Sequence, residues 1–215
     1  MLDIGAGPGT FALPLACRVR EVVALEPAAG MTAILSRRIR RRGLSNLRVV
    51  ERSWQDIEPQ AEDWTASFDL VLASMSPGLS GPEDLENMVR ASRRFCYLSG
   101  WSGTLWGRWG RARGELWPRL FDEPAGGYPN DILYPFGLLY ALGFRPELRF
   151  RWVDIELDLT AAEAREELRR FFERYAAPST RLRRRIAAYV RKYSRSGRFR
   201  QSSRQCQGFM LWEVR

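Results

Sequence analysis

Short apolar runs alternate with helical patterns through the first half of the chain. The runs at 1–4, 21–26, 47–50, 68–73 and 95–98 predict buried strands. Between them, Met31, Ile34, Leu35 and Ile39 recur at helical spacing, and Pro82 suits the first turn of another helix. Strands that alternate with helices in this way predict right-handed βαβ units. We therefore expect an α/β fold with a doubly wound, mostly parallel sheet.

The second half is less regular. Residues 101–135 hold four of the eight tryptophans without a clear period, and we expect an inserted loop or lid there. A short helix at 136–142 and a strand at 148–159 follow. Thr160 and Glu163 form a capping box that predicts a helix, and Leu182 and Ile186 mark another, so 160–205 is expected to be a helical insertion. A final antiparallel strand at 208–214 completes a seven-stranded sheet within a single domain, 1–215.

The chain begins inside a core strand with nothing to cover it. From this we expect that a segment preceding Met1 is missing.

Composition narrows the chemistry. The chain has 34 basic and 25 acidic residues, a formal net charge of +9, and only one lysine, Lys192. This predominance of arginine is typical of a GC-rich coding bias, although a strongly basic chain also suggests nucleic-acid binding as a hypothesis. The absence of histidine excludes an imidazole general base and any Ser-His-Asp or Cys-His catalysis. Three separated cysteines favour a reducing compartment and make neither a disulfide framework nor a zinc site, so we expect a cytoplasmic protein without a metal.

The most informative segment is Leu2-Asp3-Ile4-Gly5-Ala6-Gly7-Pro8-Gly9, followed by Glu26 at the end of the next strand. A strand, a glycine-rich turn and a helix form a nucleotide-cofactor site at the carboxyl edge of a parallel sheet. A terminal carboxylate such as Glu26 can accept both ribose hydroxyls. A dinucleotide site requires G-x-G-x-x-G, whereas Thr10 occupies the sixth position here and the spacing is G-x-G-x-G. A fold that has lost its ligand is a further alternative.

This spacing, with the acidic Asp3 two residues before Gly5, is similar to the first motif of the class I S-adenosylmethionine-dependent methyltransferases, which have a Rossmann-like fold. The resemblance implies S-adenosyl-L-methionine as the cofactor. It implies that the turn lines the methionine and ribose parts, that Asp3 faces the amino group and that Glu26 holds the ribose. Adenine would be flanked by Pro27 and Met31, for which core packing is the alternative. The turn residues so assigned are Gly5, Ala6, Gly7 and Gly9.

The family usually has an acidic residue after the third strand that contacts the adenine amino group. Ser53 stands at that position here. Asp56 can substitute for it, or the backbone of Trp54 can make the contact. The resemblance therefore leaves the adenine contact open.

The end of the fourth strand faces the transferred methyl group in this family. The sequence there is Ser74-Met75-Ser76-Pro77, without the Asn/Asp-Pro-Pro-aromatic motif of many amino-methylating members. Ser74 and Ser76 are candidates to orient a substrate, and Ser74 also for cofactor contact; a plain turn is the alternative for Ser76. Tyr128 and Asp131 are further candidates, with a turn again the alternative.

The sequence favours methyl transfer to a small-molecule acceptor held beneath the tryptophan-rich segment. One alternative is an RNA methyltransferase that uses the basic C-terminal third, where the run from Arg191 to Arg204 crosses a Ser/Gly-rich loop. Another is a cofactor-binding subunit without activity of its own. No membrane partner is expected, and the oligomeric state is left open.

Overall fold

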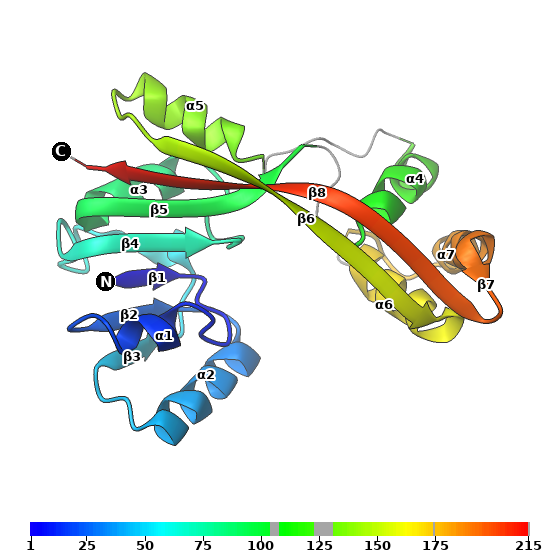
Figure 1. The fold of residues 1–215 in the computed structure, drawn as a ribbon, viewed down its shortest axis with the longest axis horizontal. Helices are drawn as coiled ribbons and strands as arrows, with labels where there is room; N and C mark the ends of the chain where they lie inside the picture. The colour runs from blue at the N-terminus through cyan, green and yellow to red at the C-terminus, as the bar shows by residue number, and fades with distance from the viewer. Residues whose placement is uncertain (104–107, 123–130, 174, 215) are drawn as a thin grey trace. The chain divides into compact units, whose positions relative to one another are not determined.

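The chain divides into two compact units (Figure 1). The computed structural model describes residues 1–103, 108–122, 131–173 and 175–214. Unit 1 comprises Met1–Gly100, Pro129–Phe150 and Gly208–Arg215, and unit 2 comprises Trp101–Tyr128 and Arg151–Gln207. The sequence pattern pointed to one domain with insertions at 101–135 and 160–205. The two stretches of unit 2 overlap both of those segments.

The sheet follows the order β3-β2-β1-β4-β5-β8-β6. Its first five strands pair in parallel (Figure 1). They are β1 (Leu2–Ile4), β2 (Val22–Leu25), β3 (Leu47–Val50), β4 (Phe68–Ser74) and β5 (Ser92–Ser102). β8 (Arg198–Glu213) runs opposite to β5, and β6 (Glu147–Thr160) lies beyond it. The doubly wound α/β fold with an antiparallel last strand is thus confirmed. The sheet has one strand more than the seven predicted: the two-residue strand β7 (Ser194–Arg195), which pairs with the start of β8.

Alternating side chains of the strands pack against helices on both faces of the sheet, as strand geometry requires. On one face, Val22 and Ala24 pack with helices α1 (Ala12–Ala16) and α2 (Ala29–Arg42). On the other, Val23 and Leu25 join the core formed with α3 (Pro82–Ala91) and α5 (Leu133–Ala141). Pro82 begins α3 as predicted, and Gly43 ends α2 with a φ of 61° in the left-handed region.

Unit 2 has its own apolar core. Helices α4 (Gly110–Phe121), α6 (Ala161–Phe172) and α7 (Thr180–Tyr193) contribute to it together with Leu157 and Phe199 of β6 and β8. The predicted capping box is present, because Thr160 Oγ1 accepts from the Glu163 N–H at 3.2 Å and Glu163 Oε2 accepts from the Thr160 N–H at 2.8 Å. No helix in the described part of either unit is long and apolar enough to cross a bilayer.

Unit 2 also corrects two predictions. A helix, α4, occupies part of the segment that was expected to be a loop or lid. β8 begins at Arg198 rather than at 208, so the supposed Ser/Gly-rich loop is the end of α7, a tight hairpin and the first half of a long strand.

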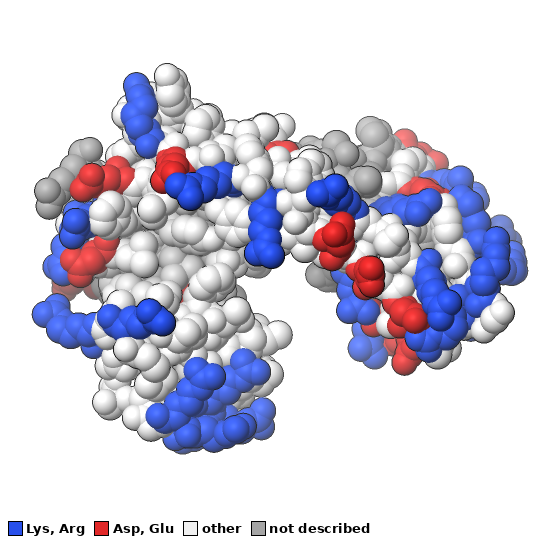
Figure 2. Space-filling view, in the orientation of Figure 1, with Lys and Arg blue, Asp and Glu red and all other residues white. Residues whose placement is uncertain are grey.

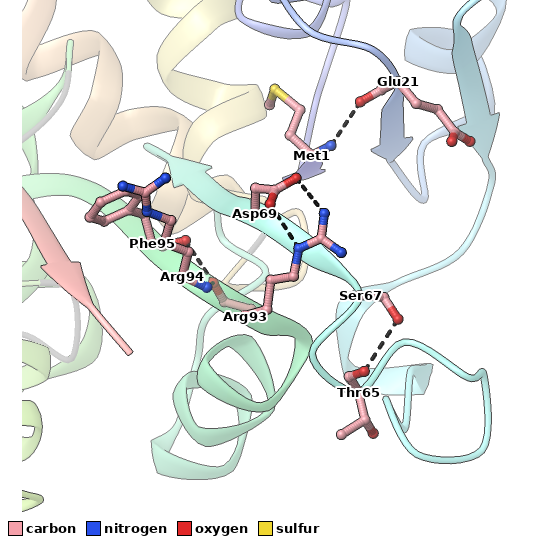
Figure 3. A network of polar contacts seen from close by, with 9 residues as sticks. Met1, Glu21, Thr65, Ser67, Asp69, Arg93, Arg94 and Phe95 are labelled. Carbon is pink, nitrogen blue, oxygen red and sulfur yellow. Dashed lines mark hydrogen bonds and ion pairs between the residues drawn. The ribbon is translucent and has the colours of Figure 1, made fainter. Parts of the chain in front are cut away.

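The amino ends of β1, β4 and β5 carry a polar network (Figure 3). The Met1 nitrogen donates to the Glu21 carbonyl at 2.7 Å. Asp69 accepts two hydrogen bonds from Arg93, each of 2.7 Å, which lower the pKa of its carboxyl. In a parallel sheet this edge lies opposite the carboxyl edge that carries the glycine-rich turn. The two ends of the sheet can therefore be altered separately.

Candidate cofactor-binding site

The glycine-rich turn between β1 and α1 combines close packing with an open approach. Gly5 has a φ of 72°, and a Cβ there would lie 2.1 Å from Ser76 Oγ, so only glycine fits. Gly7 also has a positive φ, 55°, but a Cβ there would meet no described atom within 4 Å. A Cβ at Gly9 would lie 2.5 Å from Leu35 Cδ1 in the core. Gly5 and Gly9 thus allow the turn to pack, and Gly7 presents bare backbone to open space.

Hydrogen bonds fix this turn to the end of β2. The N–H groups of Gly5 and Ala6 both donate to the Leu25 carbonyl, at 2.8 and 3.0 Å. Ala6 is buried. The turn is therefore held in place by backbone contacts before any ligand binds.

Glu26 joins the turn to the start of α2. It is 8% exposed, and its two carboxylate oxygens accept from the N–H groups of Gly7 and Ala28, each at 2.9 Å. Each oxygen keeps a second acceptor site. The carboxylate can therefore order the turn and still accept hydroxyl groups from a ligand.

Asp3 is a buried carboxyl with unused hydrogen-bonding capacity. It is 2% exposed, and Oδ2 has no partner in the described part of the chain. Burial raises the pKa of Asp3 to about 7, partly offset by a hydrogen bond from the Ala12 N–H and reinforced by the charge of Glu26. A buried, unpartnered polar atom beside an open glycine turn fits a ligand that brings a donor or a cation.

Pro27 precedes α2, and Met31 lies in the first turn of that helix. Both are exposed, Met31 by 42%. Core packing, the alternative interpretation of Met31, is therefore wrong. A role of the two side chains beside adenine stays a prediction.

The carboxyl end of β3 leads into a short 3₁₀ helix, η1 (Trp54–Asp56). The Trp54 side chain is 2% exposed and donates from Nε1 to the Asp84 carbonyl at 2.9 Å, so its indole is committed to the core. Ser53 Oγ contacts Gln55 Oε1, and Gln55 Nε2 donates to the Gly78 carbonyl at 2.8 Å. Asp56 is exposed. The backbone of Trp54 and the carboxylate of Asp56 both stay candidates for an adenine contact.

Glu51 is a carboxylate that the sequence reasoning passed over. It follows β3 directly and accepts from the hydroxyl of Thr32 in α2. The signal was present in the sequence, because Glu51 is an acidic residue at the carboxyl end of the third strand. The family pattern places that acid two positions later, at Ser53.

The end of β4 lies against the glycine-rich turn. Ser74 Oγ and Ser99 Oγ are 2.8 Å apart, and Ser76 Oγ accepts from the Gly78 N–H at 3.1 Å while it packs on Gly5. Ser76 thus forms a turn and also borders the predicted cofactor site. Met75, between Ser74 and Ser76 in the chain, is 39% exposed and has a φ of 51°. A positive φ is unusual for a bulky residue. No sequence signal pointed to Met75.

Two further candidates come from the segment before α5. The Asp131 carboxylate accepts from the Leu133 N–H at 3.0 Å, as a turn residue does. Its predicted catalytic role stays a prediction. Tyr128 lies outside the described residues.

Comparison with known proteins agrees with this geometry. The family model described as a methyltransferase domain matches residues 1–100, which include the glycine-rich turn, Glu26 and the end of β4. Residues 1–100, a little under half of the chain, are thus similar to a methyltransferase domain.

Individual relatives show the extent of the likeness. Over 91 residues the chain is 38% identical to an uncharacterised protein of Haemophilus influenzae, a match covering 41% of this chain and 31% of that one. Over 103 residues it is 35% identical to the 23S rRNA (uracil(1939)-C(5))-methyltransferase RlmD of Edwardsiella ictaluri, covering 46% and 23%. A putative methyltransferase of Bacillus halodurans has the same fold, with a TM-score of 0.60 at 15% identity over 99% of this chain and 91% of that one. The chain thus spans less than a third of these two curated relatives.

S-adenosylmethionine is the cofactor that the resemblance to class I methyltransferases implies. The residues present in unit 1 fit that molecule. Asp3 offers a buried acceptor for its ammonium group, Gly7 an open stretch of backbone, and Glu26 free acceptor sites for ribose hydroxyls.

Proposed function

We propose that this protein transfers a methyl group from S-adenosylmethionine, which binds at the carboxyl edge of unit 1. One observation carries the proposal: the unpartnered oxygen of buried Asp3 lies at the end of β1, where the open glycine turn begins. Leaving a buried carboxyl oxygen without a partner is costly, so such an atom favours a ligand that supplies a donor. The ammonium of the cofactor supplies one.

The residues of unit 1 divide the binding work. Glu26 accepts the ribose hydroxyls and keeps the turn closed through its bond from the Gly7 N–H. Adenine lies between Pro27 and Met31, with its amino group on Asp56 or its ring nitrogen on the Trp54 backbone. When bound, the cofactor supplies a methyl group on a positively charged sulfur, which a nucleophile can displace directly.

The chain contributes to that displacement mainly by alignment. Holding two reactants in line lowers a barrier by roughly 7–11 kcal/mol. Ser74 and Ser76 orient the acceptor at the end of β4. An acceptor that must lose a proton gives it to a carboxylate or a tyrosine, with Asp131 and Tyr128 as candidates, because the chain has no histidine.

A small molecule is our first candidate acceptor. The sequence favoured it partly because of a tryptophan-rich lid. In the structure, however, Trp109 is 6% exposed, and Trp117 packs against Phe121 with ring centroids 4.4 Å apart. Trp109 belongs to the core of unit 2 and Trp117 packs against that core, so the two rings do not support a lid.

RNA is the second candidate, favoured by the distribution of charge. Unit 2 holds 19 basic and ten acidic residues, whereas unit 1 holds 15 of each. The relatives named RlmD are rRNA methyltransferases, but they match only about half of this chain.

Calorimetry with S-adenosylmethionine and its demethylated product tests the cofactor site. We expect one molecule of either ligand to bind, and absence of binding would refute the proposal. Transfer of a labelled methyl group from the cofactor into a small-molecule extract, or into total RNA, then tests turnover and distinguishes the acceptors. Binding without transfer into either fraction would instead support a non-catalytic cofactor-binding subunit.

A further inference from the structure

The net positive charge of the chain comes from unit 2 alone. With 15 basic and 15 acidic residues, unit 1 is neutral, and the whole formal charge of +9 belongs to unit 2. A coding bias explains why 33 of the 34 basic residues are arginine rather than lysine. Such a bias acts on both units alike. It therefore does not explain an imbalance of charge in one of them.

Part of this charge is neutralised within unit 2. Arg181 pairs with Asp122 at 3.5 Å, Lys192 with Glu115 at 3.0 Å, and Arg198 with Asp158 at 2.7 Å. These pairs involve one flank of α7 and the start of β8. They are partly exposed, and they serve the packing of unit 2 more than the binding of another molecule.

A second set of arginines has no acidic partner among the described residues. Arg184 and Arg191 lie seven residues apart on the outer stripe of α7, about 10 Å along the helix axis. Arg195 follows in β7. All three are exposed, whereas Leu182 and Ile186 of the same helix are buried in the core. We call Arg184, Arg191 and Arg195 the outer arginines. Figure 2 shows Lys and Arg side chains gathered over this end of unit 2.

We propose that unit 2 binds single-stranded nucleic acid through the outer arginines. A guanidinium group matches the geometry of a phosphate with two parallel hydrogen bonds, and arginine is suited to this contact. The inference deepens the proposed function by naming a partner, and it rests on that function only where the partner is also the methyl acceptor.

An exposed aromatic side chain favours unpaired bases over a duplex. Trp152 of β6 is 59% exposed, and the guanidinium of Arg204 lies 5.5 Å from its ring centroid. Single-stranded nucleic acid is bound by exposed aromatic rings that stack on bases beside cations that contact phosphates. Unit 2 offers both kinds of group.

An anionic membrane is the less favoured partner. A helix that lies on a membrane inserts an apolar face into the lipid. The apolar face of α7 is already used, since Leu182, Ile186 and Val190 are each at most 2% exposed in the core of unit 2. What α7 presents outward is charge.

Fluorescence anisotropy with a labelled RNA of about 20 nucleotides tests the proposal, with a DNA of the same sequence in parallel. The variant Arg184→Gln/Arg191→Gln/Arg195→Gln removes the outer arginines. Three lost phosphate contacts reduce the slope of log affinity against log salt by about 2, and they weaken binding about 100-fold at 0.1 M salt. The matched control, Arg37→Gln/Arg40→Gln/Arg41→Gln, removes the same charge from exposed positions on α2 of unit 1. It should retain nearly all of the affinity.

Three outcomes would overturn the inference. The first is that the wild-type protein binds neither oligonucleotide. The second is that the two triple variants lose affinity equally. The third is that removal of the outer arginines weakens binding only to vesicles containing phosphatidylglycerol. Binding of S-adenosylhomocysteine is measured on the same preparations. A protein that retains it and fails to bind nucleic acid refutes this inference alone, whereas loss of it in the wild type refutes the proposed function.

Discussion

The ionisation of Asp3 should control how tightly the cofactor binds. Burial raises the pKa of this carboxyl to about 7, so it is mostly protonated in slightly acidic solution. A protonated carboxyl has no charge to offer an ammonium group. If Asp3 faces the ammonium of the cofactor, binding selects the ionised carboxylate and releases the proton that Asp3 carried.

The size of the effect follows from that pKa. A group with a pKa of 7 is ionised to about 9% at pH 6 and about 91% at pH 8. The affinity for S-adenosylhomocysteine, which carries the same ammonium group, should therefore rise about tenfold over this interval. At pH 6, binding should release close to one proton, and at pH 8 only about a tenth of one.

Isothermal titration calorimetry in two buffers of different ionisation enthalpy measures both the affinity and the number of protons released. The matched variant is Asp3→Asn, whose amide oxygen can still accept from the Ala12 N–H. It should bind more weakly at pH 8 and show no pH dependence between pH 6 and 8. A variant that keeps the wild-type pH dependence would show that another group titrates and that Asp3 does not face the ammonium.

The same pKa makes a separate prediction for the ligand-free protein. The folded-state pKa of Asp3, about 7, lies above the ordinary value of 3.8 for this side chain. The protonated form is therefore favoured by folding, and its contribution is fully present below about pH 4 and lost as the pH rises through 7. Over this range the free energy of unfolding should fall by about 4 kcal/mol from Asp3 alone. Denaturant titrations should show that Asp3→Asn removes this decline; an equal decline in the variant would contradict the assignment.

Three other predictions concern single side chains. The Glu26 carboxylate now accepts from two N–H groups, and Glu26→Gln places an amide NH₂ toward one of them. Binding of S-adenosylhomocysteine should therefore weaken at least tenfold, or by about 1.4 kcal/mol. Calorimetry checks this, and the variant Glu58→Gln, at an exposed position, is the control that should bind normally. Met75→Gly relieves the strain of a left-handed backbone conformation, roughly 1–2 kcal/mol, at a small entropic cost, so the melting temperature should be kept or raised. A fall in turnover in that variant would assign the lost side chain to the acceptor site. A drop in melting temperature would contradict the strain. Thr160→Ala removes the cap of α6 and should lower the free energy of unfolding by about 1 kcal/mol without changing cofactor affinity, which denaturation and calorimetry measure side by side.

Elements with a strong local signal were predictable from the sequence. Gly43 ends α2, Pro82 begins α3, and Thr160 with Glu163 caps α6, because each signal depends on the backbone within a few residues. Helix α4 had no such signal, since it contains Gly110 and Pro118 and lacks a clear period. It forms around Ala112 and Leu116, which are buried in the core of unit 2. Tertiary packing here overrides a weak local propensity.

The first half of β8 was missed for a related reason. Its polar sequence is typical of a loop, yet Gln201 and Gln205 are buried. Burial of Gln201 is possible because its side-chain amide donates to the Tyr189 hydroxyl of α7 at 2.9 Å. A partner twelve residues away in the chain cannot be seen in a strand pattern.

The residues of the candidate cofactor site could be predicted from the sequence, whereas the surroundings of the residues at the candidate acceptor site could not. Both results have the same physical origin. The turn from Asp3 to Gly9 is contiguous, and the parallel sheet brings a further carboxylate, Glu26, to it from the next strand. A motif of this kind is visible in the sequence because its geometry is set by neighbouring residues. The residues at the end of β4 acquire their surroundings from elsewhere: Ser74 meets Ser99 of β5, and Ser76 packs on Gly5. The strained backbone of Met75 is visible only in the folded chain. If the acceptor is chosen there, its identity depends on long-range contacts, and the substitution of Met75 rather than of the glycine turn will reveal it. A variant at position 75 should then change which acceptor is methylated while cofactor affinity stays constant.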